Sequence, residues 1–149
     1  MCPGTADKHS RFNRFKKGQF WRRFMSGKIL LVDDDQDFLQ LLEFDFKKKG
    51  YQVVTASNGE EGLLKAASEN PSLIVLDIKM PKMDGYTFVR RLKKEAALKD
   101  IPLIVLTSYE PMKDMFQLEG VSDYIVKSAN MDSLISAVEK YVKPQSSKP

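Results

Sequence analysis

From Lys28 onward, short apolar runs alternate with longer segments in which apolar residues recur every three or four positions. The short runs predict β-strands, because they are rich in Val, Ile and Leu and are bounded by polar residues. The predicted strands are 28–32, 51–55, 72–76, 101–106 and 123–126. The first, third and fourth are apolar on both faces, which is typical of central strands in a parallel sheet.

The longer segments predict amphipathic helices, most of which begin at a polar cap. One face of segment 36–50 carries Phe38, Leu42 and Phe46. Asn58 and Glu61 have the spacing of a capping box. Asp84 caps a helix expected to bury Phe88, Val89, Leu92 and Ala96. Asn130 caps the last helix, with apolar positions at Met131, Leu134, Ile135, Val138, Tyr141 and Val142. A short helix is also expected within 111–119.

Strands that alternate with helices imply right-handed βαβ units and a parallel sheet. Five such units predict an α/β fold with a doubly wound parallel sheet of the flavodoxin-like type, (βα)5, and the strand order 2-1-3-4-5. In such sheets, ligands bind beyond the carboxyl ends of the strands. We therefore expect the chemistry of this chain in the residues that follow each strand.

Polar residues follow four of the predicted strands. They are Asp33, Asp34 and Asp35 after the first, Asp77 after the third, Thr107 and Ser108 after the fourth, and Lys127 after the fifth. Clustered carboxylates raise each other's pKa unless a cation neutralises them, and Mg²⁺ takes one or two carboxylates together with water and phosphate oxygens. A carboxylate beside Mg²⁺ can accept a phosphoryl group, whose oxygens a hydroxyl and an ammonium can then bind. The pattern predicts phosphoryl transfer to an aspartate.

Four stretches carry these residues, and together they resemble the motifs of one family. The stretches KILLVDDDQD, LIVLDIKMPKMDG, IPLIVLTS and DYIVK are similar to those of the receiver domain of bacterial two-component response regulators. The resemblance covers about residues 28–143. It implies a phosphoprotein of two-component signal transduction that receives a phosphoryl group from a histidine kinase or a histidine phosphotransfer protein.

The resemblance also implies roles for single residues. Asp77 would be the phosphoacceptor and would form an aspartyl phosphate. Mg²⁺ or Mn²⁺ would be held by Asp33, Asp34, Asp77 and the backbone carbonyl of Lys79. Thr107 and Lys127 would bind the phosphoryl group. Thr107 and Tyr124 would form the switch that changes the surface of the fourth helix, the fifth strand and the fifth helix.

Three features depart from the family's usual pattern. Ser128 stands where the family usually has proline, and the segment 107–127 is about two residues shorter than expected, with Pro111 near the start of its helix. The third is Lys79, whose cation lies near the mouth of the site. These features leave open an alternative, in which the chain is a protein-binding module on a receiver scaffold that phosphorylation does not switch.

The net charge of +4 is concentrated at one end of the chain. Residues 1–24 carry a net charge of +6, so the remainder carries −2. We expect residues 1–27 to be a flexible basic and aromatic extension, and 144–149 to be a polar tail. Contact of residues 8–24 with a membrane or nucleic acid is a further alternative, and translation starting at Met25 is another.

Composition narrows the class of protein. The length of 149 residues suits one domain. A single cysteine, Cys2, and a single histidine, His9, make a disulfide or a Cys/His metal site implausible. Without a signal-peptide pattern or an apolar stretch of about 20 residues, we expect a cytoplasmic protein. We expect a stand-alone regulator without a DNA-binding domain that binds an unknown output protein and is not an enzyme.

Overall fold

A computed structural model describes residues 27–78, 82–107, 120–127 and 131–142, and the structural statements below concern these residues. Its centre is a five-stranded parallel sheet with the order β2-β1-β3-β4-β5. The strands are β1 (Lys28–Val32), β2 (Gln52–Ala56), β3 (Leu73–Leu76), β4 (Leu103–Thr107) and β5 (Asp123–Val126). The predicted fold class and strand order are confirmed.

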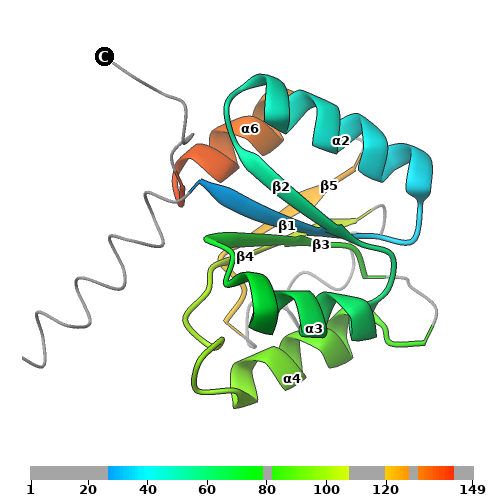
Figure 1. Ribbon diagram of the computed structural model, residues 1–149, viewed down its shortest axis with the longest axis vertical. Coiled ribbons are helices and arrows are strands. Elements are labelled where there is room, and N and C mark those ends of the chain that lie inside the picture. The colour runs from blue at the N-terminus through cyan, green and yellow to red at the C-terminus, as the bar shows by residue number, and fades with distance from the viewer. Residues whose placement is uncertain (1–26, 79–81, 108–119, 128–130, 143–149) are drawn as a thin grey trace, which may run out of the picture.

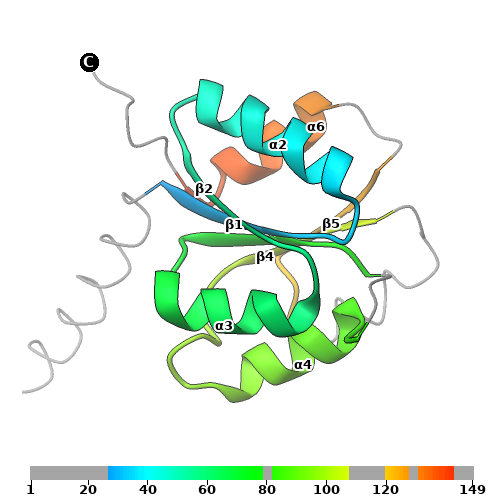
Figure 2. The ribbon, with the colours of Figure 1, turned by 45° about the vertical axis from the view of Figure 1, so that its right-hand side comes forward.

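Helices cover both faces of the sheet, as Figures 1 and 2 show. They are α2 (Gln36–Lys48), α3 (Gly59–Glu69), α4 (Gly85–Lys94) and α6 (Met131–Glu139). α2 and α6 pack on one face, and α3 and α4 pack on the other. None of the helices in the described ranges is both long and apolar enough to cross a membrane.

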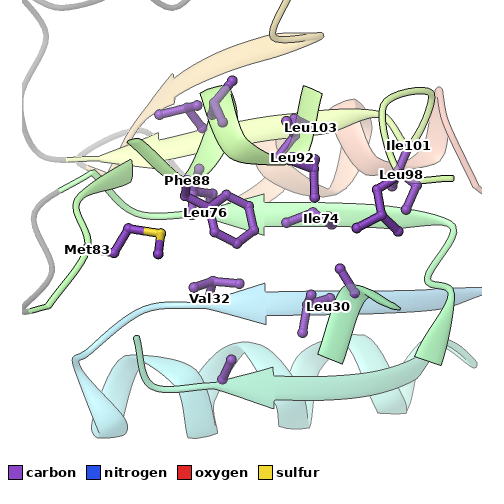
Figure 3. Packing of buried hydrophobic residues seen from close by; sticks show 14 of the residues in the cluster. Leu30, Val32, Ile74, Leu76, Met83, Phe88, Leu92, Leu98, Ile101 and Leu103 are labelled. Carbon is purple, nitrogen blue, oxygen red and sulfur yellow. The ribbon is translucent and has the colours of Figure 1, made fainter. Parts of the chain in front are cut away.

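The core consists of two apolar clusters, one on each face of the sheet. In β1, Leu30 and Val32 belong to the cluster under α3 and α4, whereas Ile29 and Leu31 belong to the cluster under α2 and α6. All four side chains are buried, because successive residues of a strand point to opposite faces. Figure 3 shows part of the first cluster, in which Phe88 of α4 lies over the sheet. The burial confirms that β1 is apolar on both faces.

Two of the predicted caps, Asn58 and Asp84, begin their helices. Asn58 Oδ1 accepts a hydrogen bond from the Glu61 N–H at 2.9 Å, and Asp84 Oδ1 accepts one from Thr87 at 2.8 Å. The capping box differs from the usual one in its second hydrogen bond. In a capping box the Glu61 carboxylate would accept from the Asn58 N–H. Here it accepts instead from the backbone N–H and the hydroxyl of Ser57, at 2.8 and 2.9 Å. The carboxylate therefore stabilises the turn before the helix as well as the helix itself.

The prediction for Ala96 was wrong. α4 ends at Lys94, and Ala96 is exposed in the turn that follows. The chain leaves the helix there, and Leu98 and Ile101 fill the core beyond it. Similarly, Tyr141 and Val142 lie beyond the end of α6, although both still pack against the sheet. The predicted helix within 111–119, the Asn130 cap, the basic extension and the C-terminal tail lie outside the described residues.

Candidate functional site

The pairing of β1 with β3 brings two acids to the same edge of the sheet. Val32 and Leu76, the last residues of these strands, are partners in the register. The Asp77 N–H donates to the Val32 carbonyl at 2.9 Å, and the Asp33 N–H donates to the Ala56 carbonyl at 3.1 Å. The backbone therefore holds Asp33 and Asp77 side by side where their strands end.

Three carboxylates converge at this edge. Asp33, Asp34 and Asp77 each offer an oxygen, and these oxygens lie within 4.8 Å of one another. Asp33 is 4% and Asp77 8% exposed, whereas Asp34 is open to solvent. Asp35, the next acid, has another role, because it caps α2 by accepting from the Phe38 N–H at 3.1 Å. The acidic cluster thus has two buried members and one at the surface.

Lys127, which follows β5, extends its ammonium into the cluster. Its Nζ lies 2.8 Å from Asp33 Oδ2 and 3.7 Å from Asp77 Oδ2. Burial by itself would lower the pKa of Lys127, but the hydrogen bond that Lys127 donates to Asp33 and the charges of the nearby aspartates outweigh burial and raise this pKa. Lys127 is therefore a fixed positive charge between the two buried carboxylates.

The environment of Asp77 disfavours its ionised form. Burial, and next the negative charge of Asp33, raise the pKa of Asp77 to about 6. The Lys127 charge and the Ile78 N–H, which donates to Asp77 Oδ1 at 2.8 Å, offset only part of this effect. The charge of Lys127 thus does not fully compensate for the burial of Asp77 and its repulsion by Asp33.

This donor set fits a hard divalent cation. Mg²⁺ binds carboxylate oxygens and keeps several water molecules, so it suits a site with one exposed acid and two buried ones. Asp33, Asp34 and Asp77 are the residues that would hold it. Lys79, whose carbonyl would be a further ligand of this ion according to the resemblance, lies outside the described residues.

A glycine allows α4 to begin directly against the site. The Gly85 N–H donates to the Ile78 carbonyl at 2.7 Å. A Cβ at Gly85 would lie 2.6 Å from the Asp77 carbonyl oxygen and 2.8 Å from the Ile78 Cα, which are distances that real Cβ atoms do not reach. A side chain there would push the helix away from the backbone of Asp77 and Ile78. Gly85 therefore sets the position of the loop that carries Asp77.

The structure places the two predicted switch residues on neighbouring strands. Thr107 is the last residue of β4, and its backbone pairs with Val126, just before Lys127. Tyr124 lies in β5, where it is half-buried and packs against the cluster under α3 and α4. Thr107 is therefore at the edge of the sheet where the acids lie, and Tyr124 is two positions further back along the adjacent strand.

Phe38 also borders this site, although its spacing in the sequence predicts only a core residue. It lies in the first turn of α2, and Lys127 Nζ is 4.6 Å from the centre of its ring. It is half-buried, whereas Leu42 and Phe46 on the same helix are fully buried. The signal in the sequence was its position: a helix that starts three residues after the first acid must begin at the ligand-binding edge.

Comparison with known proteins shows which family the chain is similar to. The family model described as response regulator receiver domain matches residues 29–139. A probable transcriptional regulator ycf27 of Pyropia yezoensis is 42% identical over 118 residues, which are 78% of this chain and 47% of the relative. The alkaline phosphatase synthesis transcriptional regulatory protein PhoP of Bacillus subtilis is 41% identical over 105 residues, 69% of this chain and 43% of the relative. The chain thus spans less than half the length of these relatives.

Solved structures agree with the fold. The response regulator protein TrrA of Thermotoga maritima, in complex with Mg²⁺-BeF, is 36% identical with a TM-score of 0.71, covering 77% of this chain and 98% of TrrA. The chemotaxis protein CheY4 of Vibrio cholerae is 30% identical with a TM-score of 0.72, covering 78% of this chain and 98% of CheY4. With the family model matching most of its length, the chain belongs to the response regulator receiver domain family of two-component signalling.

Proposed function

We propose that this protein takes a phosphoryl group onto Asp77 from a histidine kinase or a histidine phosphotransfer protein, and that the phosphorylated form binds a partner protein with altered affinity. The observation that carries the proposal is the placement of Lys127, with Nζ 2.8 Å from Asp33 and 3.7 Å from Asp77 beside three converging carboxylates. Nucleophile, counter-charge and metal ligands are gathered within one site.

The proposed step forms one bond and breaks one bond. A carboxylate oxygen of Asp77 attacks the phosphorus of a phosphohistidine, the P–N bond breaks, and the imidazole leaves with the electron pair of that bond and takes up a proton. Because the transferred group carries its charge on its outer oxygens, catalysis here consists of positioning and charge neutralisation. Later hydrolysis by water releases phosphate and restores the Asp77 carboxylate.

Each residue of the site has a task in this step. The Ile78 N–H donates to Asp77 Oδ1 at 2.8 Å, which orients the carboxylate and leaves the other oxygen, Oδ2, to attack. Lys127 already lies on the Oδ2 side and can follow the charge onto a phosphoryl oxygen. Thr107, at the end of β4, is the proposed hydroxyl partner. Mg²⁺ held by Asp33, Asp34 and Asp77 would neutralise the remaining negative charge.

The proposed output is a shift between two conformations. Movement of Thr107 toward the phosphoryl group would change the packing of Tyr124 on the neighbouring strand, and with it the surface that β5 and α6 help to form. A partner shifts this equilibrium only as far as its affinity differs between the two forms. Because the protein promotes its own phosphorylation and dephosphorylation and turns over no separate substrate, we do not class it as an enzyme.

Intact-mass spectrometry tests the proposal. The 149-residue protein is incubated with Mg²⁺ and acetyl phosphate, alongside Asp77→Asn and a sample containing EDTA. We expect one phosphoryl adduct on the wild type, and none on the variant or in EDTA. Beryllofluoride, the ion bound in the TrrA structure, provides a second measurement that fast hydrolysis cannot obscure.

Two results would redirect the interpretation. A wild type that gains no adduct and shows no spectral change with Mg²⁺ and beryllofluoride would favour the binding module that phosphorylation does not switch. Salt-sensitive binding to lipid vesicles or RNA that disappears when residues 1–24 are removed would favour the basic extension as the functional part.

A further inference from the structure

The Phe38 ring borders the charged site. Its residue lies in the first turn of α2, where the Phe38 N–H donates to the Asp35 side chain at 3.1 Å. The next residue, Leu39, and Leu42 one turn on are buried against the sheet. Cap and core contacts thus fix this turn from both sides, so the backbone that carries the ring has little freedom to move.

The ring contacts the same ammonium that the acids bind. Lys127 Nζ lies 4.6 Å from the ring centre, within the range of a cation–π interaction. Three other cations in the described ranges lie over an aromatic ring, and all are further from the ring centre: Lys48 over Phe44 and Arg90 over Tyr86 at 5.9 Å, and Lys140 over Tyr141 at 6.0 Å. The Lys127 side chain is only 22% exposed, and a partly desolvated cation interacts more strongly with a π face.

Two kinds of group surround Lys127 Nζ, namely carboxylates and an aromatic ring. Asp33 lies 2.8 Å and Asp77 3.7 Å away, and the ring of Phe38 provides a third contact. The carboxylates attract the ammonium. The ring limits the positions that the ammonium can occupy, since a lysine chain without such a contact tends to extend toward water.

The ring also lines a small cavity next to the acids. This cavity, of about 10 Å³, is bordered by Asp33, Asp77, Phe38 and Leu106, with other apolar residues behind them. Such a volume holds about one water molecule. The aromatic ring therefore covers part of the space beside the two buried carboxylates and leaves room there for little water.

We propose that Phe38 is a positioning residue that holds the Lys127 ammonium at Asp77 before the phosphoryl group arrives. The proposal rests on the proposed function, because its effect on rate presupposes phosphoryl transfer to Asp77. Holding the cation in place removes a rearrangement from the transfer step. The ring acts through Lys127 and contacts no reacting atom, so its loss lowers the maximal rate of phosphorylation more than it alters the concentration of donor needed for half that rate.

Replacing Phe38 distinguishes an effect of its π face from an effect of its size. Phe38→Leu keeps an apolar side chain and removes the ring, and we expect a three- to ten-fold lower maximal rate of phosphorylation by acetyl phosphate. Phe38→Tyr and Phe38→Trp keep the π face and should retain most of the wild-type rate. A reduced rate in all three variants alike would indicate a packing role and overturn the proposal.

Fluorinated phenylalanines give the sharper test. Site-specific incorporation of mono-, di- and trifluorophenylalanine at position 38 weakens the π face step by step with little change in shape. We expect the logarithm of the maximal rate to fall in proportion to the number of fluorines. Phe44, on the same helix, 64% exposed and remote from the acids, is the matched control, and the same series there should leave the rate unchanged. A flat response at position 38 would overturn the proposal.

A measurement without phosphoryl transfer distinguishes failure of this inference from failure of the proposed function. In protein with ¹³C-labelled lysine, the ring current of Phe38 should shift the εCH₂ protons of Lys127 upfield. Lys127→Arg assigns the signal, and Phe38→Leu should return it to the ordinary position. Absence of the shift overturns the positioning role even if Asp77 is phosphorylated. A wild type that shows the shift and takes no phosphoryl group overturns the proposed function and with it the effect on rate.

Discussion

Lys127 Nζ lies 2.8 Å from Asp33 Oδ2, although the two residues are 94 positions apart in the chain. Each follows a different strand, and Asp33 is buried while the lysine side chain is 22% exposed. A buried carboxylate is stable only with a partner. The ammonium of Lys127 therefore neutralises part of the negative charge that we propose Mg²⁺ to neutralise.

Because Lys127 and the proposed Mg²⁺ would neutralise the same carboxylates, removing Lys127 should strengthen Mg²⁺ binding. Lys127→Met removes the positive charge and keeps most of the apolar stem. We expect the Mg²⁺ affinity measured by calorimetry to rise by about tenfold, as expected for the loss of one repulsive charge at this range. In EDTA the same variant should lose about 1–3 kcal/mol of unfolding free energy, because Asp33 is left buried without its partner.

Lys140→Met is the matched control for this experiment. Lys140 pairs with Asp123 at 3.1 Å at the start of β5, the opposite end of the strand from Lys127. Its replacement should leave the Mg²⁺ affinity unchanged. A Lys127→Met protein that binds Mg²⁺ no more tightly than the wild type would argue against a shared set of carboxylates.

Adjacent residues in the run of three aspartates should differ sharply in how much they contribute to Mg²⁺ affinity. Asp34 belongs to the converging cluster, whereas Asp35 caps α2. Asp34→Asn should lower the Mg²⁺ affinity by about tenfold or more, because it removes a charged ligand. Asp35→Asn changes the charge equally and keeps a good cap, so the affinity should fall only a few-fold. Equal losses in the two variants, measured by calorimetry, would mean that the cluster acts only through its total charge.

Gly85 should tolerate no side chain. The Cβ of Gly85→Ala would lie 2.6 Å from the Asp77 carbonyl oxygen and 2.8 Å from the Ile78 Cα. Both are backbone atoms, so the acceptor loop itself must shift. We expect a loss of about 2–3 kcal/mol in unfolding free energy, measured with urea, together with slower phosphorylation.

Gly62→Ala provides the comparison for Gly85→Ala. Its Cβ would lie 3.0 Å from side-chain atoms of Phe88 and Val32, which can move a little. The greater helix propensity of alanine offsets part of the strain, so the net loss should be at most about 1 kcal/mol. Comparable losses in the two variants would show that the approach of Gly85 to the backbone of Asp77 has no special cost.

The fold and the gathering of the acids could be predicted from the sequence, because both depend on local patterns. Strands such as β1 are apolar on both faces, and parallel strands place their carboxyl ends at one edge. Asp33, Asp77 and Lys127 could therefore be brought together without knowing any distance. Similarly, Asn58 and Asp84 mark helix starts by residue type alone.

Features set by contacts distant in the chain could not be predicted. Ala96 continues the helical apolar pattern, yet the helix ends before it because Leu98 and Ile101 reach the core from the turn beyond. Phe38 has the spacing of a core residue, and its place at the start of a helix puts it near the ligand-binding edge, but the contact of its ring with Lys127 leaves no signal in the sequence. The sequence likewise does not give how closely Gly85 approaches the backbone of Asp77, because that distance depends on the packing of α4 against the end of β3.

The raised pKa of Asp77, about 6, makes the stability of the protein depend on pH when no divalent cation is present. An acid whose pKa is higher in the folded than in the unfolded state favours folding while it is protonated. That advantage is complete below about pH 4 and is lost as the pH rises through 6. Asp77→Asn cannot ionise, so in EDTA it should become more stable than the wild type across this window, by about 1–2 kcal/mol above pH 7 once solvent screening is allowed for.

Urea unfolding in EDTA between pH 4 and pH 8 measures this difference. Asp84→Asn removes a carboxylate from an exposed cap and keeps the cap, so its difference from the wild type should not grow over the same range. Adding Mg²⁺ should reverse the order of stability, because the wild type would hold the ion with three carboxylates and Asp77→Asn with only two. An Asp77→Asn protein no more stable than the wild type at pH 8 in EDTA would show that Lys127 alone neutralises the site, and that the acidic cluster does not need a second cation to be stable.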